Sequence, residues 1–234
     1  MNFLRFISSQ LNLLPCPGCG TGDGQGVNAL CENCRQKLLF FSDSYCRSCG
    51  GELDGVLACC SKCIKEGDRP FLEAAALFAY QDFGKDLIIR YKSGKNLAFA
   101  RIFAQMASAK LNKCCQHWDF DMIVPVPLHW SRKFSRTFNQ SELFGEFLGK
   151  EIHKPCRNDI LKRIRRTGSQ KYLSSEERHK NLRNAFAADR KKVKDRKILL
   201  VDDVFTTGAT LSCCAEELVR AGAARVYVLS IARA

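Results

Sequence analysis

The sequence has 234 residues, 46% of them hydrophobic and 26% charged, which is the ordinary balance of a globular protein with a packed core. This composition argues against an intrinsically disordered chain, and no apolar run approaches the length that a membrane-spanning helix requires. The 37 basic and 24 acidic residues give a formal net charge of +13, so an anionic ligand or a nucleic acid is an expected partner. A solvated basic surface is the alternative explanation of this charge.

The first 15 residues carry hydrophobic side chains at helical spacing, namely Leu4, Ile7, Leu11 and Leu14. A polar run at residues 8–10 interrupts them, so the segment lacks the apolar centre of a secretory signal peptide. We therefore expect an N-terminal helix and a cytoplasmic protein.

Fourteen cysteines occur in the chain, and nine of them lie between residues 16 and 63. Without an export signal, disulfide bonds are the weaker explanation of this density and metal binding is the better one. Eight of the nine form C-x2-C pairs with the spacings C-x2-C-x11-C-x2-C and C-x2-C-x10-C-x2-C: Cys16, Cys19, Cys31, Cys34, Cys46, Cys49, Cys60 and Cys63. Each pair presents two thiolates to one tetrahedral ion, and two pairs complete a closed structural zinc site.

The simplest interpretation is two successive zinc ribbons, each built from neighbouring C-x2-C pairs. The eight thiolates could also be shared in an interleaved way, and Cys59 could replace Cys60. This stretch has so few large apolar side chains that metal coordination would have to supply the missing folding free energy. We therefore expect an N-terminal helix and double zinc-ribbon region over residues 1–66, holding one or two structural Zn²⁺ ions.

A second domain is expected over residues 71–234, after a short linker. Its first predicted elements are a buried strand and two helices with apolar faces, over residues 74–80, 84–92 and 97–111. Their hydrophobic side chains indicate packing rather than chemistry. Arg90, Lys92 and Lys95 lie around Gly94, where they could reach an anion.

The next predicted strand covers residues 122–126 and ends in a turn at His129, which could also touch a ligand. Basic residues follow the turn directly, before a predicted helix over 138–148: Arg132, Lys133 and Arg136. Residues 161–186 mix Arg, Thr and Gln and predict a mobile basic flap. Between residues 129 and 197 the sequence has 20 Lys and Arg against 8 Asp and Glu, so most of the positive charge lies inside this domain.

The stretch from Ile198 to Thr210 reads I-L-L-V-D-D-V-F-T-T-G-A-T. Its apolar run predicts a strand over 198–201 that is buried on both faces. Asp202 and Asp203 follow at the carboxyl end of that strand, the edge where open α/β sheets bind ligands. The helical spacing of the residues after them predicts a helix over 210–221, with Gly222 suited to the left-handed position at its end.

The loop between this strand and helix therefore lies at a helix N-terminus, where a partial positive charge favours a phosphate. It offers hydroxyls, backbone N–H groups and a glycine that lets the backbone approach the ligand closely: Thr206, Thr207, Gly208, Ala209 and Thr210. The two adjacent carboxylates can accept hydrogen bonds from vicinal hydroxyls or hold a hard cation. A ribose 5-phosphate would satisfy both halves of this site.

Three other interpretations are weaker. A buried strand with an incidental Asp pair and a Thr-rich helix cap is the structural alternative. A response-regulator receiver also has paired aspartates after an apolar strand, but only 31 residues follow Asp203, too few for the rest of that domain. Neither G-x-x-x-x-G-K-[ST] nor G-x-G-x-x-G occurs, which argues against a P-loop nucleotidase and a dinucleotide fold.

The four apolar residues, two acids and T-T-G-x-T loop resemble the phosphoribosyl-diphosphate (PRPP) signature of type I phosphoribosyltransferases. The whole chain resembles the ComF family in three blocks, which are I-V-P-V-P-L-H-W-S-R with F-N-Q at 138–140, R-R-T-G-S-Q with Arg178, Asn181 and Phe186, and L-L-V-D-D-V-F-T-T-G-A-T. Residue 137 is Thr where the family usually has Gly, so this chain departs from the family pattern at the turn before F-N-Q.

The resemblance implies an α/β fold, a type I phosphoribosyltransferase-like parallel sheet with helices on both faces, preceded by the cysteine-rich region. It implies a cytoplasmic protein of DNA uptake and natural transformation, with single-stranded DNA and DNA-uptake or helicase proteins as partners. Phosphoribosyl transfer would use Mg²⁺-bound PRPP, with Asp202 and Asp203 on the ribose hydroxyls and the loop from Thr206 to Thr210 on the 5-phosphate. Arg132 would lie near the departing diphosphate.

The alternative function is a catalytically silent, zinc-containing adaptor that binds single-stranded nucleic acid and keeps the fold. The basic segment and the zinc ribbons favour it, with aromatic residues among the basic ones as candidate stacking surfaces: Trp130, Phe134, Phe138 and Tyr172. Such aromatic side chains more often lie in a core. The intact loop favours retained PRPP binding, so we expect an enzyme.

Overall fold

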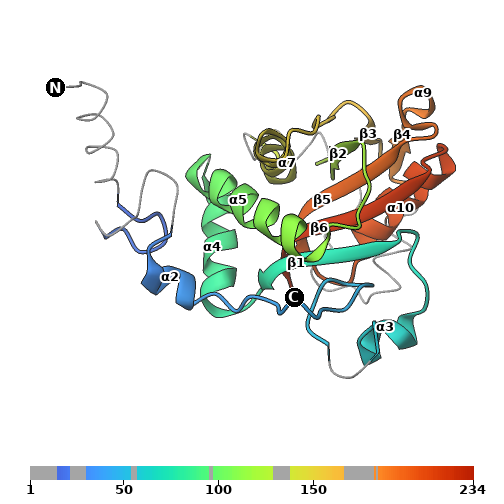
Figure 1. The fold of residues 1–234 in the computed structure, drawn as a ribbon. Helices are drawn as coiled ribbons and strands as arrows, with labels where there is room; N and C mark the ends of the chain where they lie inside the picture. The colour runs from blue at the N-terminus through green and yellow to red at the C-terminus, as the bar shows by residue number, and fades with distance from the viewer. Residues whose placement is uncertain are drawn as a thin grey trace.

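The structure is a computed structural model that describes residues 15–21, 30–53, 57–94, 97–128, 138–165, 182 and 184–234. A four-stranded sheet forms its centre, with helices around it (Figure 1). Among the described residues the elements are α2 (Glu32–Gln36), α3 (Ser61–Glu66), β1 (Glu73–Ala79), α4 (Asp82–Ser93), α5 (Leu97–Cys114), β2 (Met122–Pro125), α7 (Gln140–Glu151), β3 (Leu161–Arg163), β4 (Phe186–Ala188), α9 (Arg190–Val193), β5 (Lys197–Phe205), α10 (Ala209–Arg220) and β6 (Arg225–Arg233).

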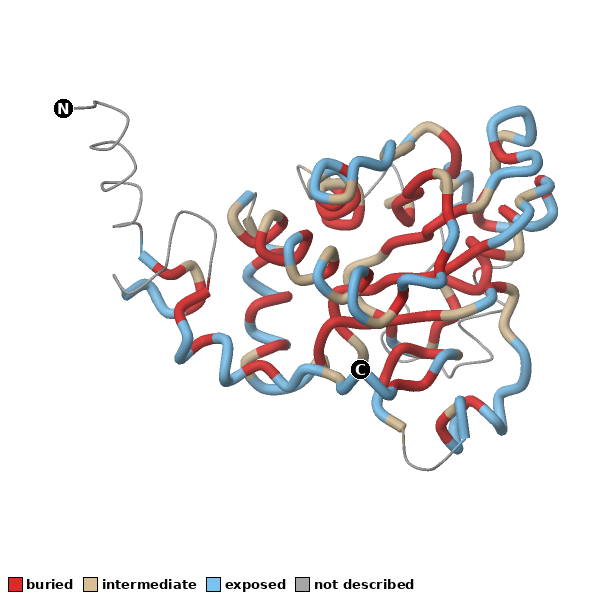
Figure 2. The backbone as a smooth tube through the Cα atoms, viewed as in Figure 1, coloured by how far each residue is buried: buried red, intermediate tan, exposed pale blue. Residues whose placement is uncertain are grey.

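All strands of the central sheet run parallel, in the order β1-β6-β5-β2. β5 is an inner strand, because its Leu199 pairs with Ile123 of β2 and its Leu200 pairs with Val228 of β6. Parallel strands buried on both faces are expected to be continuously apolar, and the I-L-L-V run of β5 is fully buried. Figure 2 shows that most of the sheet is buried, because its strands are drawn largely in red.

Successive residues of the apolar run of β5 pack into two different cores, one on each face of the sheet. Leu199 and Val201 belong to the core that α4, α5 and α7 cover. Ile198 and Leu200 belong to the opposite core, which includes the buried side of α10. The predicted α/β class, a parallel sheet with helices on both faces and a cysteine-rich region before it, is therefore confirmed.

The main difference from the sequence-based bounds concerns β5. The predicted strand stopped at residue 201, whereas β5 continues to Phe205, so Asp202 and Asp203 lie inside the strand rather than after it. β2 pairs with β5 only as far as Val201, but β6 pairs with β5 up to Phe205. The segment of β5 with the two acids is therefore paired with β6 on one edge, whereas on the other edge it extends past the end of β2.

A short antiparallel pair, β3 with β4, was not predicted and lies at the base of the expected basic flap. Leu161 and Phe186 of this pair are buried in the core beside α10. Residues 166–181 and 183, which make up most of the flap, lie outside the described residues. The predicted N-terminal helix, residues 1–14, lies outside them as well.

The segment after α2 runs along the free edge of β1. Its backbone accepts hydrogen bonds there, from the N–H of Ala79 to the carbonyl of Leu39 at 2.9 Å and from the N–H of Ala74 to the carbonyl of Arg47 at 2.6 Å. Bridges join Phe40 to Phe78 and Gly50 to Ala75. An exposed edge strand is a template for unwanted pairing, and this segment covers that edge.

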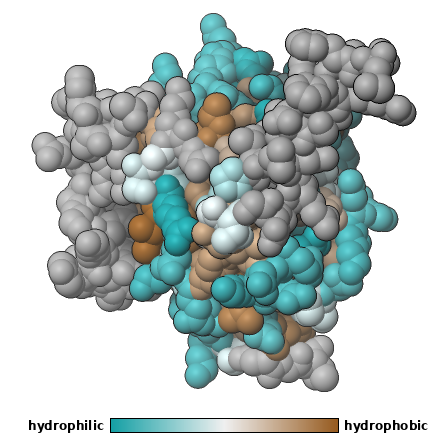
Figure 3. Space-filling model, turned by 90° about the vertical axis from the view of Figure 1, so that its left-hand side faces the viewer, coloured by the Kyte–Doolittle hydropathy of each residue, from teal (hydrophilic) through white to brown (hydrophobic). Residues whose placement is uncertain are grey.

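No helix among the described residues is both long enough and apolar enough to cross a membrane. The described side chains on the face shown in Figure 3 are mainly hydrophilic, with hydrophobic ones gathered in small separate areas.

Candidate functional site

The first four-cysteine group consists of Cys16, Cys19, Cys31 and Cys34, whose sulfur atoms all lie within 4.8 Å of one another. The Cys16 sulfur accepts a hydrogen bond from the backbone N–H of Cys31 at 3.2 Å, which joins the two C-x2-C pairs. Cys31 precedes α2 and Cys34 lies within it, so the short helix presents the second pair. The Arg90 guanidinium of α4 donates to the carbonyl of Gly18 at 2.6 Å and thereby holds the first pair.

The second four-cysteine group consists of Cys46, Cys49, Cys60 and Cys63, and its sulfur atoms also lie within 4.8 Å of one another. It repeats the first, because the Cys46 sulfur accepts from the backbone N–H of Cys60 at 3.3 Å and Cys60 precedes α3. The structure thus groups neighbouring C-x2-C pairs rather than interleaved ones. Cys60, not Cys59, belongs to the group.

The sulfur spacing in both groups is close to that of a zinc site. Four sulfur atoms at the usual zinc distance of about 2.3 Å from a tetrahedral centre are about 3.8 Å apart. The sulfur of Cys19 lies 3.7 Å from that of Cys31, and the sulfur of Cys49 lies 4.0 Å from that of Cys60. The two groups are therefore consistent with structural zinc, and when bound, the ions would stabilise these small loops against unfolding.

Gly50 allows the second group to pack closely against the sheet. It has a φ of 73°, in the left-handed region, and a Cβ there would lie 2.5 Å from the carbonyl carbon of Ala75 in β1. Gly20, at the equivalent position of the first group, has a φ of 79°, but a Cβ there would meet no described atom within 4 Å. The second group therefore contacts the backbone of the sheet directly.

The acid pair Asp202 and Asp203 lies where β5 passes the end of β2. Ser141, in the first turn of α7, donates a 2.8 Å hydrogen bond to Oδ1 of Asp202, and the backbone N–H of Asp203 donates to the same oxygen at 2.9 Å. Lys92, in the last turn of α4, lies 2.9 Å from Oδ1 of Asp203. The two carboxylates are thus held by two different helices on the same face of the sheet.

The surroundings of Asp202 favour its neutral form. Burial raises the pKa of Asp202 to about 7, and the negative charge of Asp203 acts in the same direction. The hydrogen bond from Ser141 and the charge of Lys92 lower the pKa but do not offset these effects. A carboxyl group with a raised pKa next to a second carboxyl group is typical of sites that bind or transfer charge.

The helices that hold the acids are also tied to each other. The Tyr91 hydroxyl donates to the carbonyl of Gln140 at 2.7 Å, and the Gln140 amide donates to the carbonyl of Lys92 at 3.2 Å. Asn139 caps α7 by accepting from the N–H of Ser141 at 3.2 Å. Its amide group donates to the carbonyl of Val126, just after β2, at 3.0 Å. The F-N-Q motif therefore fixes the start of α7 against the sheet and aims Ser141 at Asp202.

The threonine-rich loop follows β5 and leads into α10, as the sequence predicted. α10 begins at Ala209, one residue earlier than expected, and Gly208 precedes it with a φ of 79°. The hydroxyl of Thr207 accepts a 3.4 Å hydrogen bond from the N–H of Ala209. Thr206 is exposed, and Thr207 and Thr210 are half-buried. The loop thus lies at the N-terminus of a regular helix. It directly follows β5, the strand that carries the acid pair.

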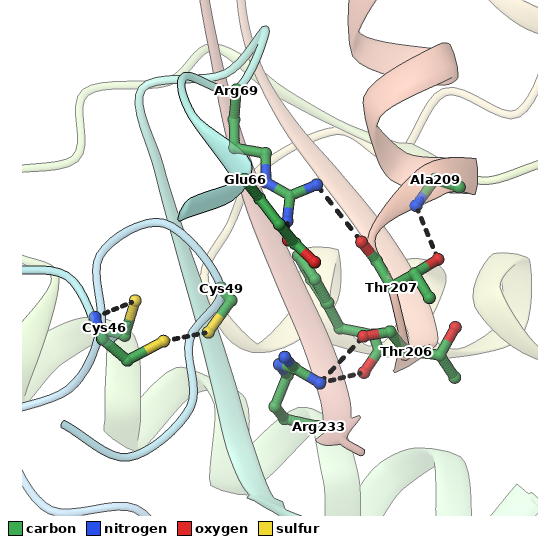
Figure 4. A network of polar contacts seen from close by, with 10 residues as sticks. Cys46, Cys49, Glu66, Arg69, Thr206, Thr207, Ala209 and Arg233 are labelled. Carbon is green, nitrogen blue, oxygen red and sulfur yellow. Dashed lines mark hydrogen bonds and ion pairs between the residues drawn. The ribbon is translucent and has the colours of Figure 1, made fainter. Parts of the chain in front are cut away.

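Two arginines that the sequence did not single out contact this loop (Figure 4). Arg233 donates to the carbonyl of Thr206 at 2.9 Å, and Arg69 donates to the carbonyl of Thr207 at 3.3 Å. Both guanidinium groups also lie over the ring of Phe205, at 5.1 Å and 5.8 Å. No local pattern marks either arginine, because they come to the loop from distant parts of the chain.

Some predicted site residues lie outside the described residues, among them Arg132, His129, Lys133 and Arg136, together with the aromatic residues Trp130, Phe134 and Tyr172. Lys95 also lies outside them. Of the residues expected around Gly94, Lys92 contacts Asp203, whereas Arg90 points to the first four-cysteine group instead of an anion site. Phe138, the remaining aromatic candidate, is half-buried.

No protein-family model matches the chain. Two solved structures have low similarity to it. The glutamine PRPP amidotransferase from B. subtilis is 21% identical with a TM-score of 0.38, covering 60% of this chain and 26% of its own. The Leishmania donovani UMP synthase is 20% identical with a TM-score of 0.35, covering 58% of this chain and 22% of its own.

Curated relatives match over most of the chain. DNA utilization protein YhgH of Salmonella typhi is 30% identical over 224 residues, which are 88% of this chain and 98% of the relative. Competence protein ComFC of Bacillus subtilis is 28% identical over 201 residues, 83% of this chain and 80% of the relative. Competence protein F of Haemophilus influenzae is 31% identical over 240 residues and covers 100% of both chains. Because a relative matches over the full length at this identity, the chain belongs to the ComF/YhgH competence family.

Proposed function

We propose that this chain is a cytoplasmic protein of DNA uptake and natural transformation that binds Mg²⁺-PRPP and transfers its phosphoribosyl group. The observation that carries the proposal is one strand, β5, which bears the acid pair and leads through the loop at 206–210 into the N-terminus of α10. The names of the relatives, competence and DNA utilization proteins, support the biological setting. DNA-uptake or helicase proteins are the expected protein partners.

In this proposal each half of the site binds one half of a ribose 5-phosphate. Asp202 and Asp203 accept hydrogen bonds from the ribose hydroxyls, with Mg²⁺ accompanying the diphosphate. Thr206, Thr207, Gly208, Ala209 and Thr210 hold the 5-phosphate at the N-terminus of α10. Arg132 completes the site near the diphosphate. Catalysis is electrostatic, because the residues stabilise the leaving diphosphate and the cationic sugar.

The first experiment is calorimetry of the full chain with PRPP and Mg²⁺. We expect the wild-type protein to bind, and the double variant Asp202→Ala, Asp203→Ala to show no binding while keeping its zinc content and thermal transition. Asp119→Ala is the matched control, because this exposed acid pairs with Lys197 at the opposite end of β5. Wild-type protein without PRPP binding, or a double variant that binds equally well, would contradict the proposed site.

Binding and transfer need separate measurements. Release of diphosphate from Mg²⁺-PRPP, measured with and without single-stranded DNA, tests whether the chain catalyses the reaction. An intact PRPP affinity without any diphosphate release would exclude water and single-stranded DNA as acceptors of the phosphoribosyl group.

The second candidate function is a catalytically silent adaptor that binds single-stranded nucleic acid. The excess of basic residues between positions 129 and 197, where 20 Lys and Arg stand against 8 Asp and Glu, favours it. Lys192 and Arg157 of this segment both pair with Asp159, which is one of these eight acids. If phosphates are bound, affinity should fall steeply as salt rises, because counterions are released from the nucleic acid. No binding at low salt, or binding insensitive to salt, would reject this candidate.

The division into residues 1–66 and 71–234 stays a prediction. Limited proteolysis after zinc removal tests it, because separate domains should leave a protected fragment that begins near residue 71. Digestion of the whole chain without a protected fragment would contradict two separate domains. Backbone hydrogen bonds join residues 39–50 to β1, so loss of zinc could also destabilise the sheet.

A further inference from the structure

The second four-cysteine group lies next to the loop of the proposed PRPP site, and Arg233 joins them. Arg233 is the last residue of β6. Its guanidinium donates to the carbonyls of Thr206 and Phe205, at 2.9 Å and 3.4 Å. Its side chain packs close to Gly51, where a Cβ would lie 3.2 Å from Cγ of the arginine. The same Cβ would lie 3.5 Å from the sulfur of Cys49, so the Arg233 side chain packs beside a candidate zinc ligand and also hydrogen-bonds the loop backbone (Figure 4).

Arg69 forms a second connection from the other half of the same group. It follows α3, the helix that begins after Cys60 and contains Cys63. Arg69 forms an ion pair with Glu66, the last residue of α3, and donates to the carbonyl of Thr207 at 3.3 Å. With Arg233 this makes two contacts to the consecutive loop carbonyls of Thr206 and Thr207, from two side chains that lie beside the second group.

The loop has little room to move independently of these arginines. Both guanidinium groups lie over Phe205, the residue that ends β5. Gly208 packs against the same ring, since a Cβ there would lie 2.7 Å from Cζ of Phe205 and 3.0 Å from Nη1 of Arg69. The position of the loop at 206–210 is therefore set by Phe205 and by the two arginines that lie over its ring.

The first four-cysteine group is anchored to a helix instead of to the loop. Its anchor is Arg90, which connects Gly18 to α4, and Phe83 of α4 packs near the same glycine. The two groups are alike in their internal hydrogen bonds, so they provide a natural comparison between a group that contacts the loop and one that contacts α4.

We propose that Arg233 and Arg69 are positioning residues for the loop at 206–210, and that the second four-cysteine group sets the shape of this loop through them. The loop binds the sugar phosphate only when the second group is intact. The first group has no such effect. This inference rests on the proposed function for its ligand, but the coupling between the second group and the loop is a structural property that can be measured without PRPP.

The test compares Arg233→Gln and Arg69→Gln with Arg90→Gln in the full-length protein. Hydrogen exchange of the loop amides is measured without ligand, and PRPP affinity is measured with Mg²⁺. Loss of a charged hydrogen bond corresponds to about a tenfold change or more, so we expect at least about tenfold faster loop exchange and tenfold weaker PRPP binding in the first two variants. Arg90→Gln should leave both unchanged, and Arg233→Lys should restore part of the loss because it keeps the charge.

A second pair of variants tests the group itself. Cys60→Ser and Cys31→Ser change the equivalent residues before α3 and α2. Only Cys60→Ser should speed exchange in the loop, with zinc content measured on both proteins. If Cys60→Ser does not fold, the arginine variants decide, because they leave all eight cysteines in place.

The outcomes are separable. Loop exchange that is unchanged in Arg233→Gln and Arg69→Gln, or changed equally in Arg90→Gln, overturns the inference. A wild-type protein that does not bind PRPP contradicts the proposed function alone, since loop exchange still reports whether the second group controls the loop. Faster exchange with unchanged PRPP affinity would overturn the positioning role.

Discussion

Ser141 donates its hydroxyl hydrogen to Oδ1 of Asp202 over 2.8 Å, across the space between α7 and β5. The contact is produced by the cap of α7, because Asn139 binds the N–H of Ser141 and fixes the first turn of the helix. The hydrogen bond lowers the pKa of Asp202, but burial still raises that pKa to about 7. Asp202 is therefore a half-buried acid whose charge changes near neutral pH.

This shift predicts how stability depends on pH. An unfolded aspartate has a pKa of about 3.9, so between that value and about 7 the folded state holds a proton that the unfolded state has released. The free energy of unfolding contributed by Asp202 should therefore fall as pH rises through this window. Asp202→Asn cannot ionise and should lose this part of the pH dependence, which chemical denaturation at pH 5 and pH 8 would measure.

Other groups titrate in the same range, so the difference between wild type and variant is the informative quantity. Asp119→Asn is the control, because Lys197 lowers the pKa of this exposed carboxyl instead of raising it. If wild type and Asp202→Asn lose equal stability between pH 5 and pH 8, the pKa of Asp202 is not raised in the folded protein.

Much of the site could be predicted from sequence because its residues are adjacent in the chain. The acids, the threonines and Gly208 lie within nine residues of one another, and the strand-to-helix transition around them has a local pattern. The same holds for the C-x2-C pairs, since their spacing within each pair shows which two thiols can share one ion. Local patterns of this kind predict the strand and the helix correctly, although the bounds of both differ by a few residues in the structure.

The remaining contacts could not be predicted because they connect distant parts of the chain. Ser141 is 61 positions from Asp202, and Arg69 is 138 positions from Thr207. The length of β5 was also underestimated, because the polar pair at 202–203 looks like a strand end in sequence. In the structure, hydrogen bonds to β6 continue the strand past those acids.

Zinc stoichiometry tests the grouping of the cysteines. We expect close to two zinc ions per chain, because each four-cysteine group has the sulfur spacing of a zinc site. Cys60→Ser should lose about one ion, whereas Cys59→Ser, one residue away but outside the group, should keep both. Elemental analysis of the purified proteins provides the measurement. Less than half an ion in the wild type, or equal losses in both variants, would reject these groups.

Gly50 and Gly20 provide a matched test of how the second group contacts the sheet. Both have a positive φ, so alanine at either position should cost about 1–2 kcal/mol of stability from backbone strain. Only Gly50→Ala also meets the backbone of Ala75, 2.5 Å from the new Cβ, and it should be clearly less stable than Gly20→Ala. Thermal or denaturant unfolding compares them. Equal losses would mean that the second group does not rest on β1 as described.

The final prediction compares the two glycines at the ends of α10. Gly208 and Gly222 have φ values of 79° and 99°, so Gly208→Ala and Gly222→Ala share the strain of the left-handed region. At Gly222 the nearest atom to a new Cβ would be 3.5 Å away, whereas at Gly208 the ring of Phe205 would be 2.7 Å away. Gly208→Ala should therefore displace the loop and weaken PRPP binding, by about tenfold or more if one charged hydrogen bond to phosphate is lost. Gly222→Ala should lose stability without losing affinity. PRPP calorimetry and thermal unfolding on the same preparations separate the two effects, and equal PRPP affinities in both variants would show that the loop at 206–210 does not bind the ligand.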